Sequence, residues 1–172
     1  MKTMSKRAIY RYGEPVLRQK CDPVERITPV IRQLVFDLLE TMYAAPGVGL
    51  AANQVGVPLR ICVIDVRPDN RPRPLVLINP RIVDRQEEVE EEEGCLSLPG
   101  MMSKIKRARW VRVEAINEKG FPIMIEGEGF LGRALQHEVD HLEGKLYIDY
   151  LQPWRRKKLE QEIKARKKEG KW

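Results

Sequence analysis

The stretch that most constrains this chain is QHEVDHLEG at positions 136–144, which has the pattern H-E-x-x-H. In a helix, side chains four positions apart lie one turn apart on the same face, so His137 and His141 can direct imidazole nitrogens at one metal ion. Glu138 lies beside such an ion, where it can transfer protons instead of binding the metal. The chain has only 2 His, and both are in this pattern. We therefore predict a metal site on a helix, and not a surface helix with two histidines at a chance spacing.

A catalytic site of this kind takes three protein ligands and keeps a fourth position open for water, so a third ligand is needed. The chain has 3 Cys, an odd number, which predicts free thiols and no disulfide framework. Cys62 lies in an apolar run and Cys21 precedes Asp22-Pro23, so both are expected to be structural. Cys95 follows a glycine and precedes a short apolar segment that ends in Pro-Gly. We predict that its thiolate completes a His, His, Cys site from a neighbouring strand.

Length and composition indicate one domain: 172 residues, 42% hydrophobic and 33% charged. No apolar run approaches the roughly 20 residues of a membrane span, and residues 1–9 lack the apolar segment of a secretory signal, so we expect a cytoplasmic protein. Residues 152–172 contain nine Lys or Arg and three Glu, which equals the net charge of +6 of the whole chain. We expect residues 1–150 to form the catalytic part and residues 151–172 a basic C-terminal helix of the same domain.

Hydrophobic spacing predicts the elements. A helix capped by Thr28 should run to about Tyr43, and strands are expected at 60–66, at 74–83 with an interruption at Asn79-Pro80, and in a hairpin of 109–117 with 121–126. The small-residue stretch 47–56 either packs in the core or lines a cleft. Gln54, an amide in an otherwise apolar run, favours the cleft. The glutamates of the acidic run 87–93 are expected to be exposed to solvent. The fold class is α+β: antiparallel β-sheets around a central helix that carries the metal motif, with an N-terminal and a C-terminal helix.

Three motifs occur in order: GVGLAANQVG at 47–56, EGCLS at 93–97 and QHEVDHL at 136–142. Together they resemble the peptide deformylase family, and the likeness extends from residues 13–18 to the basic tail, which looks like the C-terminal helix of the bacterial-type enzymes. The resemblance implies a metal-dependent hydrolase that removes the N-formyl group from the initiator methionine of nascent polypeptides and releases formate.

The resemblance also implies roles for individual residues. Cys95, His137 and His141 match the metal ligands, and the family's physiological ion is Fe(II), for which Zn, Ni or Co can substitute. Glu138 matches the catalytic carboxylate, while Gln54 and the backbone N–H of Leu96 match the groups that hold the carbonyl oxygen. The substrate-binding positions implied are Val48, Gly49, Gly94, Phe130, Arg133 and Ala134. The aliphatic stem of Arg133 is expected to line the methionine pocket while its charged head reaches water.

The residues leave two other functions open. A zinc endopeptidase would need a third ligand elsewhere, such as Glu160, because Tyr147 occupies the position of the third histidine in the longer H-E-x-x-H-x-x-G-x-x-H pattern. A basic binding protein with a structural metal would need four protein ligands. The expected partners are N-formyl-Met nascent peptides and, through the basic helix, the ribosome, with no membrane and no sequence-specific nucleic acid binding. The alternative for the tail is a solvated helix.

Overall fold

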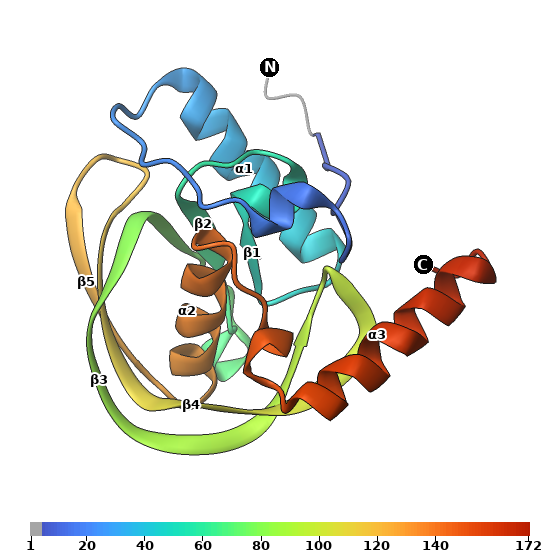
Figure 1. Ribbon diagram of the computed structural model, residues 1–172. Helices are drawn as coiled ribbons and strands as arrows, with labels where there is room; N and C mark the ends of the chain where they lie inside the picture. The colour runs from blue at the N-terminus through green and yellow to red at the C-terminus, as the bar shows by residue number, and fades with distance from the viewer. Residues whose placement is uncertain (1–4) are drawn as a thin grey trace.

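The computed structural model describes residues 5–172 as one antiparallel sheet with three α-helices and short 3-10 turns (Figure 1). The α+β class predicted from the sequence is confirmed. No helix in residues 5–172 is both long and apolar enough to cross a membrane. In chain order the elements are η1 (Pro15–Arg18), α1 (Pro29–Ala44), β1 (Gly49–Ala51), η2 (Ala52–Val55), β2 (Ile61–Ile64), η3 (Pro68–Asn70), β3 (Leu75–Cys95), β4 (Leu98–Ile116), β5 (Pro122–Glu128), α2 (Gly129–Leu142), η4 (Tyr147–Tyr150) and α3 (Pro153–Lys168).

The sheet has the order β1-β2-β3-β4-β5, so every strand pairs with its neighbours in sequence. β3 and β4 have 21 and 19 residues, and their ribbons bend around α2, which lies inside the curve of the sheet (Figure 1). The metal motif is therefore on a helix enclosed by the sheet, where the surrounding strands can supply the remaining ligand.

Alternate residues of β2 face two different cores, as strand geometry requires. Ile61 and Val63 pack with α1, whereas Cys62 and Ile64 pack with α2. The predicted cap of α1 is confirmed, since the N–H of Ile31 donates to Thr28 Oγ1 at 3.3 Å. Helices thus cover both faces of this part of the sheet, and the metal motif lies on one of them.

A third core fixes the C-terminal helix to the body. Leu159 and Ile163, four positions apart on α3, pack with Leu98 and Ile105 of β4 and with Tyr147 of η4. Residues four positions apart share one face of a helix, so both side chains can pack on the body at once. Because Leu98 comes directly after the Cys95 turn, α3 supports the strand end that carries the candidate thiolate ligand.

The sequence prediction for β3 was too short. Asn79 takes a positive φ of 52° and exchanges two hydrogen bonds with the backbone of Val24, so the strand is irregular there but continues. The acidic run is also part of the strand: Glu90 pairs with Lys106 and Glu92 with Lys104 across β4. Opposite charges across the ladder let an acidic segment form a strand. The prediction of solvated charge holds for the exposed glutamates but is wrong for Glu93, which is buried.

Candidate active site and metal centre

The three predicted ligands converge at one point. Cys95 Sγ lies 3.4 Å from His141 Nε2, which lies 3.1 Å from His137 Nε2, and the three donor atoms are all within 4.8 Å of one another. Cys95 is the last residue of β3, and the two histidines are one turn apart on α2. A soft thiolate with two imidazole nitrogens is a donor set that suits a first-row transition metal. The residues therefore fit a metal ion.

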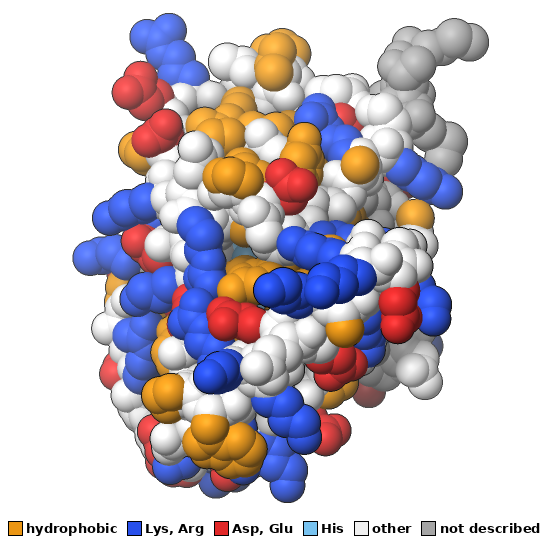
Figure 2. Space-filling model, turned by 45° about the vertical axis from the view of Figure 1, so that its right-hand side comes forward, with side chains coloured by type: hydrophobic (Ala, Val, Ile, Leu, Met, Phe, Trp, Pro, Cys, Tyr) orange, Lys and Arg blue, Asp and Glu red, His pale blue; other side chains and the backbone are white. Residues whose placement is uncertain are grey.

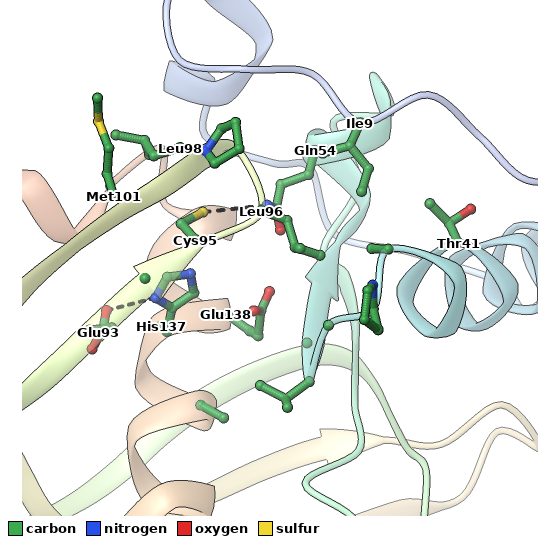
Figure 3. Close-up of a pocket in the computed structure, with 18 of the residues that line it drawn as sticks. Ile9, Thr41, Gln54, Glu93, Cys95, Leu96, Leu98, Met101, His137 and Glu138 are labelled. Carbon is green, nitrogen blue, oxygen red and sulfur yellow. Dashed lines mark hydrogen bonds and ion pairs between the residues drawn. The ribbon is translucent and has the colours of Figure 1, made fainter. Parts of the chain in front are cut away.

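Glu93 orients the first histidine. Its Oε2 accepts a hydrogen bond from His137 Nδ1 at 2.7 Å, which places the ring proton on Nδ1 and directs the lone pair of Nε2 toward Cys95 (Figure 3). Arg107 donates two bonds to the same carboxylate, at 3.0 and 2.7 Å. Burial raises the pKa of Glu93, but the hydrogen bonds from His137 and Arg107 outweigh it and hold that pKa well below its usual range. The carboxylate is therefore ionised and fixed.

Glu138 is the candidate proton-transfer group. It is buried beside the donor cluster, and its Oε2 has no hydrogen-bond partner among the residues that the structure describes. Burial raises the pKa of Glu138 to about 7, in the range where a general base works best. Gly49 permits this placement, because a Cβ there would lie 2.5 Å from Glu138 Oε1.

Burial also affects the second histidine. The pKa of His141 lies well below its ordinary value because burial, and then the neighbouring His137, disfavour the charged form. A neutral imidazole is the form that binds metals. Asn53 of η2 donates to the backbone carbonyl of His141 at 2.7 Å, which ties the first motif to the end of α2.

Gln54 presents its amide nitrogen to the site. Its Oε1 accepts from the N–H of Ala51 at 2.9 Å, so the opposite end, Nε2, points toward Ser97 Oγ at 3.0 Å and Cys95 Sγ at 3.7 Å. Gln54 and Cys95 are both labelled in Figure 3. The orientation results from the hydrogen-bond pattern, since only the oxygen can accept from a backbone N–H. The N–H of Ser97 donates to Cys95 Sγ at 3.4 Å. Leu96, between them, lies in the turn from β3 to β4.

The other predicted residues line one cleft of about 790 Å³ that contains Cys95, His137 and Glu138 (Figure 3). Its lining includes all the substrate-binding positions named above: Val48, Gly49, Gly94, Phe130, Arg133 and Ala134. His141 lies behind this surface, against Cys95. The volume is in the range of small-ligand sites.

The expectation for Arg133 needs correction. Arg133 lines the cleft, but its head does not reach water: the residue is 4% exposed, and its guanidinium donates to Glu93 Oε1 at 3.2 Å, to Ile105 O at 3.0 Å and to Val89 O at 3.1 Å. A buried guanidinium must find acceptors, and the curved β3–β4 ladder supplies them. Arg133 therefore shares the buried carboxylate of Glu93 with Arg107.

Sequence reasoning missed Glu93 and Arg107. A signal for Glu93 was present: alternate strand residues share a face, so a strand that extends to the inward-facing Cys95 places Glu93 on the same side. No comparable signal marks Arg107, which is 14 positions from Glu93 and 33 from Asp140, its other partner. Lys6, Arg7, Ile9 and Arg11 also line the cleft, and the sequence analysis assigned them no role.

A helix with the H-E-x-x-H pattern inside a curved antiparallel sheet, with a cysteine as candidate third donor, is typical of a metallohydrolase. The family model described as polypeptide deformylase matches residues 6–157. The chain belongs to this family, and it is an enzyme that removes the N-formyl group from the initiator methionine of nascent polypeptides.

Relatives and solved structures agree. A peptide deformylase of Endomicrobium trichonymphae is 47% identical over 169 residues, which are 98% of this chain and 100% of the relative. The crystal structure of a peptide deformylase from Legionella pneumophila has a TM-score of 0.90 and 42% identity over 95% of this chain and 96% of that one. The Met-Ala-Ser-bound structure of an Acinetobacter baumannii deformylase has a TM-score of 0.80 and 30% identity, over 87% and 100% of the two chains.

The family membership removes the two other candidate functions. Glu160 of α3 is the ligand that an endopeptidase would need. It accepts hydrogen bonds from Tyr12 and Arg156 and lies outside the cluster of Cys95, His137 and His141. A binding protein with a structural metal is likewise not supported, because the family consists of enzymes.

Proposed function

We propose that Cys95, His137 and His141 hold one Fe(II) ion in the working enzyme and that Glu138 transfers the protons of the reaction. The convergence of the three donors beside the buried Glu138 carboxylate is the observation that carries this proposal. When bound, such an ion lowers the pKa of water toward neutrality and so supplies a nucleophile. Glu138 accepts the proton of the attacking water and delivers it to the amine nitrogen that leaves.

We further propose that Gln54 Nε2 and the N–H of Leu96 hold the formyl oxygen. Donors fixed at this point stabilise the negative charge that develops on the oxygen, and the loss of one such donor costs about 10²–10³ in kcat. Gln54 is suited to the task because its other end is fixed by Ala51, so the donor needs no reorganisation during the reaction. The methionine side chain would lie against Val48, Gly94, Phe130, Ala134 and the stem of Arg133, while the backbone of Gly49 pairs with the peptide.

The direct test is formate release from a formyl-Met peptide, combined with metal analysis. Cys95→Ala should lose metal and activity together, because it removes a ligand. Cys62→Ala is the matched control: this thiol is fully buried on the α2 side of the sheet and is not among the three donors, so metal content should be unchanged. A Cys95→Ala protein that keeps its metal would contradict the ligand set.

The choice of Fe(II) has its own test. Metal availability and exposure to oxygen decide occupancy as well as affinity does, so protein made in air can contain Zn or Ni. Anaerobic loading with Fe(II) should give the more active enzyme. Equal activity of fully loaded zinc and iron forms would contradict the proposal.

The Acinetobacter neighbour was solved with Met-Ala-Ser, a peptide that begins with methionine, which supports the same substrate here.

We also propose that residues 151–172 are a docking extension of the catalytic part (1–150) and bind the ribosome in the cytoplasm. Two of the three arginines of α3 form ion pairs: Arg156 pairs with Glu160 and Asp149, and Arg166 pairs with Glu162. The lysines are exposed and form no ion pair within residues 5–172: Lys157, Lys158, Lys164, Lys167 and Lys168. Figure 2 turns the α3 side toward the viewer, and blue Lys and Arg side chains lie across it. Free cations at this density favour a polyanion such as ribosomal RNA.

Charge reversal of Lys164, Lys167 and Lys168 to Glu tests the docking. Ribosome binding should be lost and formyl-Met peptide hydrolysis should change little, because these side chains do not line the cleft. The control has the same charge change elsewhere: Arg85, Lys119 and Lys145 to Glu, all exposed. Ribosome binding that survives in the α3 variant, or fails equally in the control, would contradict the proposal.

A further inference from the structure

One wall of the cleft is basic. Lys6, Arg7 and Arg11 line it from the N-terminal segment, together with Ile9. In Figure 3, Ile9 and Thr41 lie beyond Gln54 and Leu96, on the opposite side from Met101. The same cleft therefore contains both the candidate catalytic groups and this basic wall.

The segment is held in a defined place. The N–H of Tyr10 donates to Gln54 O at 2.7 Å, and the N–H of Tyr12 donates to Ser97 O at 2.8 Å. These bonds attach the segment to both motif loops that carry the candidate oxygen-binding groups. Arg11 lies between the two bonds, so its position relative to the reaction centre is fixed by the backbone.

Two of the three cations have no partner in the described structure. Arg7 Nε is 2.9 Å from Asp37 Oδ2, and this pair anchors the segment on α1. Lys6 and Arg11 are exposed, and within residues 5–172 neither forms an ion pair. The exposed acid of the lining, Glu92, lies opposite Lys104 in the sheet. The wall keeps an excess of positive charge.

The formyl-methionine group gives these cations nothing to bind. A formamide and a thioether are both uncharged, and the negative charge that develops in the reaction is at Gln54 and Leu96. Lys6 and Arg11 are therefore available only to peptide residues that come after the methionine. Complementary charge at the rim of a site selects partners more than it adds affinity.

We propose that Lys6 and Arg11 make the enzyme prefer peptides with Asp or Glu side chains at the first few positions after the formyl-methionine. This inference rests on the proposed function and names a substrate subclass for the same cleft. The contacts are at an exposed rim, so the preference acts on peptide binding and leaves the chemical step unchanged.

The test compares C-terminally amidated peptides at low salt: formyl-Met-Ala-Ala, formyl-Met-Glu-Ala, formyl-Met-Ala-Glu and formyl-Met-Ala-Lys. At least one acidic peptide should have a kcat/KM about three- to tenfold above the alanine peptide, through KM, as expected for one or two exposed ion pairs. The kcat/KM of the lysine peptide should be lower than that of the alanine peptide. In the Lys6→Gln/Arg11→Gln variant, the ratio of kcat/KM between each charged peptide and the alanine peptide should approach one. Salt at about 0.5 M should have a similar effect on the parent enzyme.

The control is Lys145→Gln/Arg85→Gln, which removes the same charge from exposed positions outside the cleft and should keep the preference. The free acid of formyl-Met-Ala-Ala separates side-chain recognition from recognition of a peptide's end. Equal rates on all amidated peptides, a preference unchanged in the Lys6/Arg11 variant, or an increase seen only with the free acid would overturn the proposal. Activity on the amidated alanine peptide would persist in each case, so the proposed function is judged separately.

Discussion

Helices α2 and α3 have similar lengths, 14 and 16 residues, but opposite relations to the rest of the molecule. Nine residues of α2 are buried, and four of them are polar: Arg133, Gln136, Glu138 and His141. On α3 only Leu159 and Ile163 are buried. A buried polar group needs a partner inside the protein, whereas an exposed one is free to find it outside. Most polar groups of α2 therefore face this molecule's own interior, whereas the exposed lysines of α3, which form no ion pair within residues 5–172, are available to another molecule.

The largest expected effect comes from a carboxylate of α2. Glu138→Ala should lower kcat by about 10²–10⁴, because a positioned proton-transfer group contributes that much. Metal content should stay the same, since Glu138 is not one of the three donors. Formate release and metal stoichiometry on the same sample are the measurements. A variant that turns over nearly as fast as the parent would make Glu138 a buried polar group without a catalytic role.

The second effect is on stability, at the carboxylate that joins α2 to the sheet. Glu93→Gln removes the buried carboxylate that Arg107 and Arg133 share and leaves them only Asp140 and Glu91, which are more exposed. Breaking a buried pair costs about 3–5 kcal/mol of unfolding free energy. Metal affinity should also fall by about 10- to 100-fold, because His137 loses the group that orients it.

The control for this prediction is Glu90→Gln, the same change in the same strand at an exposed position. It should alter the free energy of unfolding by about 0.5 kcal/mol or less. Denaturant titration of both variants, with and without metal, separates the loss of the buried ion pairs from the loss of metal affinity. Equal losses in the two variants would contradict the central role of Glu93 in this buried ion-pair cluster.

The position of Glu93 also marks what the sequence could not predict. The motif residues were found because H-E-x-x-H is a short local pattern whose spacing matches one turn of a helix. The strand that carries Glu93 was predicted to be solvated because a run of glutamates has no alternation of apolar and polar types to reveal its inner face. Its partners Arg107 and Arg133 are distant in sequence, and only the curvature of β3 and β4 brings them together. The cap of α1 and the two apolar contacts of α3 were predictable, since each depends on neighbouring residues.

A smaller effect is expected where α3 touches the body. Leu159→Ala should cost about 2 kcal/mol of unfolding free energy, the low end for a buried leucine, because the residue is at the edge of its core. Lys158→Ala, at the adjacent exposed position, should be nearly neutral. Thermal or denaturant unfolding measures both. If the two variants were equally stable, α3 would be only loosely attached to the body.

The smallest effect concerns a single hydroxyl. Tyr12→Phe removes the bond from the Tyr12 hydroxyl to Glu160 Oε1, which is 2.8 Å long, and should cost about 1 kcal/mol. Tyr10→Phe is the same chemical change at an exposed residue whose hydroxyl has no hydrogen bond in the described structure. It should leave the free energy of unfolding unchanged. A loss in the control as large as in Tyr12→Phe would show that the bond to Glu160 adds nothing.

The contacts of Tyr12 also bear on how the chain folds during synthesis. Its hydroxyl reaches Glu160, and its carbonyl accepts from the indole N–H of Trp172 at 3.2 Å, across 160 positions of sequence. Contacts of such separation close last, after the intervening strands have paired. While a ribosome is still translating residues 159–172, the turn that carries Cys95 lacks its backing from α3. The turn that carries Cys95 therefore gains its support from α3 only after all three motif segments have been synthesised.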